Sequence, residues 1–129
     1  MSNFKPQDNK NYEHNVFRGI PAKPKQEDLF SEFLNEQDIS VNTVNALVLD
    51  VRKFAKWFTT VNQEPWDIER VTIRDVSDYR EYLRTEKQQA ASTINRNLAS
   101  IRKYFKWLSG KGCVEVNPTI GIKELKKQN

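Results

Sequence analysis

The chain has 129 residues, with 21 Lys and Arg against 17 Asp and Glu, and therefore a formal net charge of +4. This length supports one modest domain with its own core and excludes a large multidomain enzyme. The single cysteine, Cys113, cannot form an internal disulfide, and the sequence has no Cys/His cluster. We therefore expect a reducing, cytoplasmic setting with no metal or other cofactor. Neither a signal peptide nor an apolar run of membrane-spanning length is recognisable, so no membrane association is expected.

The positive charge is concentrated in the second part of the chain. Residues 1–39 carry five bases against seven acids, a net charge of −2, and residues 40–129 carry 16 bases against 10 acids, a net of +6. From Lys87 through Val114 the sequence holds six bases and no acid. A solvated helix face is the ordinary explanation of a charge run, but an acid-free stretch of this length favours a polyanionic partner.

Apolar spacing predicts four helices behind an irregular start. Residues 1–25 contain three prolines and no sustained period, so we expect a flexible N-terminal arm followed by one domain over 26–125. The first helix covers about ten residues from Gln26, and the second opens at Ser40 or Asn42 and ends near Thr59. The third is capped by Thr72 and ends near Glu86, and the fourth is capped by Ser92 and stopped by Gly110 and Gly112. A last helical turn is expected in Ile120–Leu125. No segment alternates as a strand, so the predicted class is all-α, a bundle of four to five helices.

The second and fourth predicted helices resemble each other. When residues 42–58 are aligned with residues 92–108, six of 17 positions are identical. Two amphipathic helices share apolar positions by necessity, but a core does not require the identical polar pairs Thr43/Thr93, Asn45/Asn95 and Arg52/Arg102. The repeat therefore predicts that both helices present similar amino-terminal ends to one kind of partner.

A helical wheel selects the face of each helix that lies opposite the apolar stripe. On the fourth helix this face holds Thr93, Arg96, Ser100 and Lys103, and on the second it holds Thr43, Ala46, Asp50 and Lys53. Two hydroxyls and two cations beside a positive helix end suit phosphates, and an α-helix fits the DNA major groove. The second helix is less cationic, and Asp50 argues against deep phosphate contact there. Ala46 is suited to a thymine methyl, with Thr43 and Asn45 close to the DNA backbone. Trp57 and Trp107 could stack on bases, but packing against neighbouring segments is the favoured interpretation.

These residues together carry a family resemblance. Ser40-x-x-Thr43 opens a helix that ends Phe54-x-x-Trp57-Phe58, and Val71-Thr72 opens the next. Ser92-Thr93-Ile94-Asn95-Arg96 then opens the fourth, and Asn117-Pro118 closes the pattern. From Ser40 through Ile122 the chain resembles the core-binding domain of tyrosine recombinases, the phage-integrase and Xer-like site-specific recombinases. The resemblance implies a SAM-like helical bundle that clamps one face of duplex DNA near the crossover site during DNA integration or recombination. The candidate DNA contacts are Thr43, Asn45, Ala46, Lys53, Ser92, Thr93, Arg96, Ser100 and Lys103.

The resemblance also implies what this chain leaves to another domain. Recombinase chemistry uses a tyrosine nucleophile with arginines, a lysine and a His-x-x-Arg helix, all in a separate catalytic domain. This chain has one histidine, His14. We therefore expect no catalytic residues and no enzyme activity in this chain. We also expect the chain to be a fragment that was cut before the catalytic domain. The expected partner is double-stranded DNA, with no membrane and no small-molecule substrate. The isolated domain is expected to be a monomer and its parent a tetramer on DNA, in a prokaryotic cell at the nucleoid.

Two other functions stay open on the sequence. A helical protein-interaction module would use Trp57, Trp107 and exposed apolar residues to bind a partner helix. A helix-turn-helix regulator would also bind DNA, but the connections around the third helix run about twelve and five residues, longer than that motif's turn.

Overall fold

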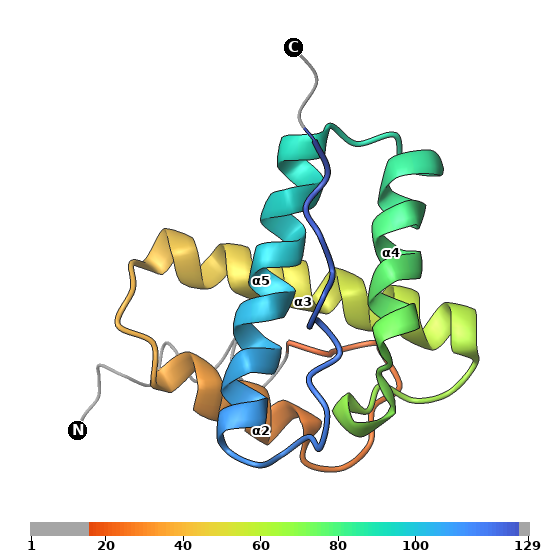
Figure 1. The fold of residues 1–129 in the computed structure, drawn as a ribbon. Helices are drawn as coiled ribbons and strands as arrows, with labels where there is room; N and C mark the ends of the chain where they lie inside the picture. Colours follow the sequence, from red (N-terminus) through yellow and green to blue (C-terminus); the bar gives the residue numbers. More distant parts are fainter. Residues whose placement is uncertain (1–15, 127–129) are drawn as a thin grey trace, which may run out of the picture. The chain divides into compact units, whose positions relative to one another are not determined.

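The computed structural model describes residues 16–126, so residues 1–15 and 127–129 lie outside the described part. Within it the chain forms helices α2 (Gln26–Asn35), α3 (Val41–Asn62), α4 (Ile73–Thr85) and α5 (Ala91–Gly110), with a short 3-10 helix, η1 (Ile68–Arg70), before α4 (Figure 1). The β-structure of residues 16–126 is limited to one bridge between Ala22 and Trp66. The all-α class is therefore confirmed. The chain divides after Asp67 into two compact units, the first with α2 and α3 and the second with η1, α4 and α5.

Trp66 is at the centre of the aromatic core of the first unit. Its side chain is 0% exposed, and its ring lies 5.9 Å from that of Phe17, 5.8 Å from Phe54 and 5.6 Å from Phe58. Its main chain is held as well, because the Trp66 N–H donates to Pro21 O and the Lys23 N–H donates to Trp66 O. The connection that follows α3 is thereby part of the core, which the sequence pattern did not predict.

The chain packs into the first unit from Val16, ten residues before the expected start at Gln26. Val16, Phe17 and Ile20 are buried although their spacing follows no helical period. The Glu27 carboxylate accepts from the Phe17 N–H at 3.1 Å, and the Arg52 guanidinium donates to Val16 O at 2.7 Å. Residues 16–25 are therefore not loosely attached, because long-range contacts that spacing cannot reveal hold them.

Local signals set the bounds of the long helices. Ser40 caps α3 by accepting from the Thr43 N–H, and Gln63 ends it with a left-handed backbone, three residues beyond the predicted end at Thr59. Thr72 and Asp75 form a reciprocal capping box at the start of α4, as the sequence predicted. The predicted cap of α5 is wrong. Its N-cap is Ala90, which makes no side-chain cap bond, and Ser92 lies inside the first turn.

The tail after α5 is not the helical turn that the sequence predicted. The Asn117 side chain accepts from the N–H and hydroxyl of Thr119, which closes a turn, and the chain then continues without helix through residues 122–126. In Figure 1 this segment runs back beside α5 toward the start of that helix. Its main-chain groups bond to side chains of α4 and α5, which takes the place of helical hydrogen bonds.

The burial of Trp66 predicts a large difference between two tryptophan substitutions. Trp66→Ala removes a side chain with three aromatic neighbours and should lower the free energy of unfolding by about 3 to 5 kcal/mol. Trp57→Ala removes a half-buried ring and should cost clearly less. Urea unfolding followed by circular dichroism measures both, and equal shifts in the midpoint would contradict this account of the core.

Candidate nucleic-acid interface

The outer face of α5 carries a narrow positive stripe. Its exposed residues recur at alternating steps of four and three, which places them in one row along the helix axis. The stripe, called here the α5 stripe, consists of Ser92, Arg96, Ala99, Lys103 and Lys106. Its three cations have no acid near them in sequence, because residues 87–114 contain none. The row therefore begins at the amino end of α5 and holds three cations and no acid.

The predicted contacts on α5 differ in their exposure. Ser92, Arg96 and Lys103 are exposed, Thr93 is half-buried, and Ser100 is buried at 8% exposure. The wheel placed Ser100 opposite the core, and this placement is wrong. Burial extends around α5 beyond the predicted apolar stripe to Asn97, Ser100 and Tyr104. The exposed face is therefore rotated away from the side of the helix that carries these three residues. A wheel that takes the core from apolar residues alone misses this rotation.

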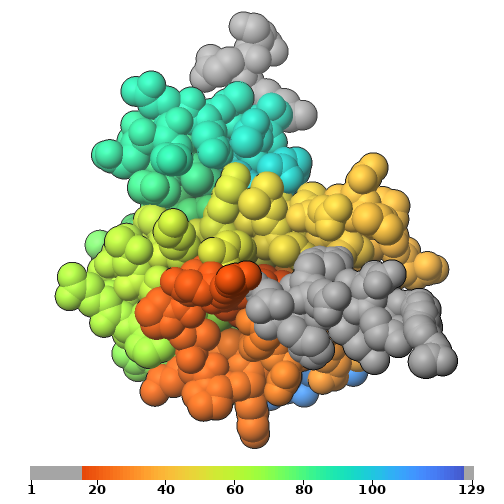
Figure 2. All heavy atoms as spheres, turned by 180° about the vertical axis from the view of Figure 1, so that it is seen from behind, coloured from red at the N-terminus to blue at the C-terminus, as the bar shows by residue number. Residues whose placement is uncertain are grey.

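The outer face of α3 is less charged than that of α5. Its exposed row, called the α3 stripe, consists of Asn42, Asn45, Leu49, Lys53, Lys56 and Thr60. Figure 2 shows atoms of α3 as a band that runs from gold to yellow-green. Of the predicted contacts, Thr43, Asn45 and Lys53 are exposed, and Ala46 is half-buried. Asp50 is 0% exposed, so its predicted place on the open face is wrong, for the same reason as Ser100.

Residues at matching positions of the sequence repeat in α3 and α5 also have similar exposure. Lys53 and Lys103 are exposed in the two stripes, as are Lys56 and Lys106, and the polar pair Asp50 and Ser100 is buried. Trp57 stacks on Phe54 at 6.0 Å, just as Trp107 stacks on Tyr104 at 6.4 Å, both with rings 17° from parallel. Each tryptophan thus stacks on a residue of its own helix, and its packing against neighbouring segments, which the sequence favoured, stays a prediction.

The repeated arginines bond to the chain itself. Arg52 donates to Val16 O at 2.7 Å, and Arg102 donates to Ile122 O at 2.9 Å. Both are half-buried. The repeat predicts a shared outside partner for this pair, whereas each guanidinium bonds to a non-helical segment of its own unit.

The amino ends of the two helices differ in their capping. The Ser40 hydroxyl lies 3.0 Å from the Thr43 hydroxyl and accepts from the Thr43 N–H, so side chains already occupy the start of α3. Ala90 offers no such group to α5. The first N–H groups of a helix point outward and carry partial positive charge, so an end without a side-chain cap favours an anion.

Asn97 connects Arg96 to the loop before α5. Its side-chain oxygen lies 3.5 Å from Nη2 of Arg96, and its amide donates to Oε1 of Gln89 at 3.3 Å. Asn97 itself is 2% exposed. A buried amide thus contacts the guanidinium end of the exposed arginine that stands nearest the amino end of the α5 stripe.

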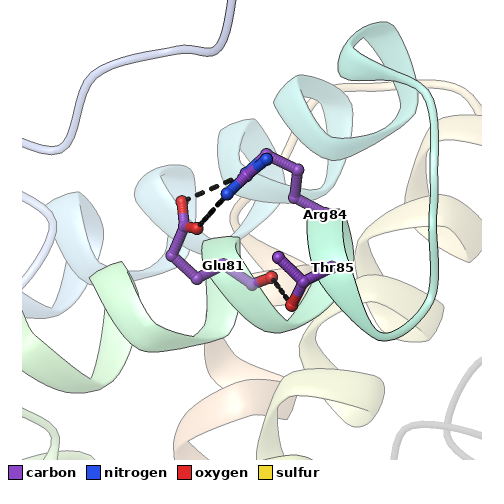
Figure 3. A network of polar contacts seen from close by, with 3 residues as sticks. All are labelled: Glu81, Arg84 and Thr85. Carbon is purple, nitrogen blue, oxygen red and sulfur yellow. Dashed lines mark hydrogen bonds and ion pairs between the residues drawn. The ribbon is translucent and has the colours of Figure 1, made fainter.

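The described helices divide the charge unequally. Counting formal charges, α2 carries −3, α3 +2, α4 zero and α5 +4. On α4 the acids lie beside the bases: Arg74 is 3.7 Å from Asp78, and Nη2 of Arg84 is 2.7 Å from Oε1 of Glu81 (Figure 3). Among the four helices, α5 therefore combines the highest charge with a complete lack of acids.

Sequence reasoning missed two lysines of the stripes, Lys56 and Lys106. They are identical in the repeat and share the exposed row with Lys53 and Lys103. The lysine pair that both copies of the repeat share, three residues apart, was the signal that could have identified them. For residues 16–126, no group of His, Cys, Asp and Glu is arranged to hold a metal ion. Nor is any helix there long and apolar enough to cross a membrane.

Comparison with known proteins identifies the family. The family described as phage integrase, N-terminal SAM-like domain, matches residues 27–112. The chain belongs to this family. It is 31% identical to tyrosine recombinase XerC of Roseiflexus sp. (strain RS-1) over 85 residues, which are 66% of this chain and 26% of that protein. It is also 31% identical over 98 residues to tyrosine recombinase XerC of Lactobacillus delbrueckii subsp. bulgaricus (strain ATCC BAA-365 / Lb-18), 75% of this chain and 32% of the relative.

A relative with a different name is also similar to this chain. TnP I resolvase of Bacillus thuringiensis is 26% identical over 83 residues, 64% of this chain and 28% of that protein. The chain thus spans about a quarter to a third of the length of these relatives, 26% to 32%. No solved structure matches the chain significantly. The SAM-like all-α domain predicted from the sequence is confirmed.

The ion pair on α4 predicts the titration of Glu81. Hydrogen bonding from Arg84, with the attraction of its charge, holds the pKa of the Glu81 carboxyl below its ordinary value of 4.5. Because the folded-state pKa is lowered, the stabilisation is present above the unfolded-state pKa and is lost as pH falls through the folded-state value. Carbon-detected NMR titration should place the Glu81 midpoint below 4.5. The Arg84→Gln variant should raise it, and an unchanged midpoint would show that the pair does not persist in solution.

Proposed function

We propose that this domain binds duplex DNA through the α5 stripe, as the core-binding domain of a tyrosine recombinase or integrase. The observation that carries the proposal is the exposed row of Arg96, Lys103 and Lys106 on an acid-free helix. It is supported by the uncapped start of α5 and by membership of the phage-integrase family. DNA presents a regular line of negative charge and a major groove that admits an α-helix.

The contacts proposed on α5 differ in kind. Lys103 and Lys106 are exposed lysines that suit phosphates, because an ammonium acts as a point charge on a flexible stem. Arg96 can bond to phosphate or read guanine with two parallel hydrogen bonds. Ser92 and Thr93 lie in the first turn, where hydroxyls and free amides meet the DNA backbone. Ser100 is left out of the direct contacts because its side chain is buried.

On α3 we propose weaker contacts through Thr43, Asn45, Ala46 and Lys53. Asp50 does not oppose them from the surface, since its carboxylate is fully buried. Lys53 and Lys56 supply two exposed cations, fewer than α5 provides. The α3 stripe also contains Leu49 at 47% exposure, which suits contact with thymine methyls or sugars better than with phosphates.

The role proposed for the chain is binding and not catalysis. The relatives named tyrosine recombinase are three to four times longer than the matched region, so we place strand cleavage and joining in parts of such a protein outside this domain. We propose residues 26–125 as the DNA-binding unit, without a cofactor, small-molecule substrate or membrane. It is proposed to be monomeric alone and part of a tetramer on DNA in the longer protein, in the cytoplasm at the nucleoid.

Charge reversal on the α5 stripe tests the proposal directly. Arg96→Glu with Lys103→Glu should abolish binding of a labelled 20-base-pair duplex at low salt, because two phosphate contacts become repulsive. The unmodified domain should bind in the range of about 10⁻⁴ to 10⁻⁶ M typical of nonspecific binding, with a steep dependence on salt. Fluorescence anisotropy measures the affinity, and circular dichroism checks that the helices are retained.

A matched control keeps the total charge change the same. Lys23→Glu with Lys25→Glu reverses two exposed cations before α2 and should leave most of the affinity intact. If the two double variants lose the same amount of affinity, the effect is one of net charge, and the α5 stripe is not the specific binding surface. Binding that is insensitive to salt, or association of the chain with itself, would instead favour a protein-interaction module.

The burial of Ser100 gives a separate prediction. Ser100→Ala should change the affinity for duplex by less than about twofold, since a side chain at 8% exposure does not reach DNA. It should lower stability by about 1 kcal/mol, as for a buried hydroxyl that loses its hydrogen bonds. Anisotropy and urea unfolding measure these two effects, and a loss of affinity with unchanged stability would return Ser100 to the DNA contacts.

A further inference from the structure

Three side chains hold the end of the described chain against the second unit. Here the strap is defined as residues Ile122–Lys126. Arg80 of α4 donates to Lys123 O at 2.8 Å, and Arg102 of α5 donates to Ile122 O at 2.9 Å. Asn95 of α5 bonds to Leu125 twice: its amide donates to Leu125 O at 3.0 Å, and its oxygen accepts from the Leu125 N–H at 2.8 Å. All four bonds involve strap main chain, so they fix its path whatever its side chains are.

The spacing of these contacts matches an extended chain running antiparallel to α5. Arg102 and Asn95 are seven residues apart, which is about 10 Å along a helix. Ile122 and Leu125 are three residues apart, which is about 10 Å in extended chain. Two helical turns and three extended residues therefore have the same length, and Arg102 and Asn95 meet the strap in register. Figure 1 shows the strap following α5 in this direction.

This register places the last residues of the strap at the start of α5. Leu125 is bonded to Asn95 in the first turns of α5, and Arg96 of the α5 stripe is the next helical residue. Lys126 is the next residue of the strap and is exposed, as is Lys123. With Glu124 as its one acid, the strap carries a net charge of +1. The main chain next to Lys126 is thereby bonded in the amino-terminal turns of α5.

We propose that the strap is part of the DNA-binding surface, with Lys126 as an additional phosphate contact. This inference rests on the proposed function of the α5 stripe and extends it to a segment that follows the matched family region, residues 27–112. Lys126 adds a fourth cation to Arg96, Lys103 and Lys106, at the helix end that lacks a side-chain cap. The ligand is the phosphate backbone of duplex DNA, recognised by charge and not by base sequence.

Asn95, Arg102 and Arg80 are positioning residues in this proposal. Asn95 is 8% exposed, and both polar atoms of its side chain are used by Leu125. Arg102 and Arg80 are half-buried and bond to strap carbonyls. They act on DNA only through the place that they give to Lys126. Removing such a residue should therefore reduce binding although its own side chain does not touch DNA.

The first experiment compares two single losses of charge. Lys126→Gln should lower affinity for a labelled 20-base-pair duplex about tenfold at about 0.05 M salt and reduce the log–log salt slope by about 0.9. Lys111→Gln is the matched control, because Lys111 is exposed at the other end of α5. It lies about 22 Å from Arg96 along the helix, beyond a Debye length of about 10 Å. Equal effects of the two substitutions would overturn the inference.

The second experiment tests whether Asn95 acts through the strap. Asn95→Ala should speed hydrogen exchange of the Leu125 amide and lower affinity by the same factor as Lys126→Gln. The double variant should lose no more than either single variant, because both remove the same contact. Additive losses would show that Asn95 and Lys126 act independently and would overturn the positioning role. If Asn95→Ala fails to fold, Arg80→Gln loosens the strap at Lys123 from a half-buried site and replaces it in the cycle.

The outcomes separate this inference from the proposed function. If Arg96→Glu with Lys103→Glu leaves binding intact, the α5 stripe is not the DNA surface and both proposals fail. If that variant loses binding while Lys126→Gln behaves like Lys111→Gln, the stripe stands and the strap does not contribute. If the double charge reversal and Lys126→Gln both weaken binding, and the losses from Asn95→Ala and Lys126→Gln are not additive, the results support a DNA-binding surface that includes the α5 stripe and the strap.

Discussion

The hydrogen bonds from Arg52 and Arg102 to main-chain carbonyls organise both ends of the described chain. Val16 lies in a turn and Ile122 in a segment without regular secondary structure, so their carbonyls need partners from outside a helix or sheet. A guanidinium supplies several donors in a fixed plane, and a charged donor strengthens the bond to a carbonyl. Each long helix thereby fixes a non-helical segment of its own unit, at 2.7 Å for Arg52 and 2.9 Å for Arg102.

These bonds separate the formal charge of the chain from the charge at its surface. Arg52, Arg80 and Arg102 contribute to the net +4 but bond to carbonyls inside their units. Arg74 and Arg84 lie beside acids of their own helix. The outward positive charge of the two long helices thus rests mainly on lysines, with Arg96 as the exposed arginine of α5. An anionic partner would meet this smaller, ordered set and not the full count of bases.

Local signals explain the parts of the fold that the sequence predicts well. The capping box of Thr72 and Asp75 is complete within four residues, and the apolar period of α2 to α5 needs no knowledge of neighbours. The contradicted features depend on distant contacts. The strap is held by residues 20 to 43 positions away, and Phe17 reaches Trp66 across the first unit. Neither contact leaves a periodic trace.

The candidate site was predicted in part for a related reason. Arg96 and Lys103 project from α5 whatever surrounds it, so the wheel selected them correctly as exposed. Asp50 and Ser100 are polar but buried, and a wheel based on apolar residues assigned them to the outside. Lys56 and Lys106 were missed because the same error shifted the predicted open face away from them. Which polar residues a helix buries is decided by tertiary packing, and one sequence does not reveal it.

The two related helices differ most where they begin, which is why α5 is the better candidate for an anion. At the start of α3 the Ser40 side chain accepts the N–H that an anion would bind, and Ala46 stands where α5 has Arg96. At the start of α5 the N-cap supplies no acceptor, Arg96 is exposed, and Asn95 is buried under the strap. The two helices share their lysines, but the Ser40 hydroxyl caps the start of α3, whereas no N-cap side chain caps the start of α5. Free amides and a nearby cation both stabilise a phosphate, so the differences between the copies, more than their similarity, favour α5 as the point of contact.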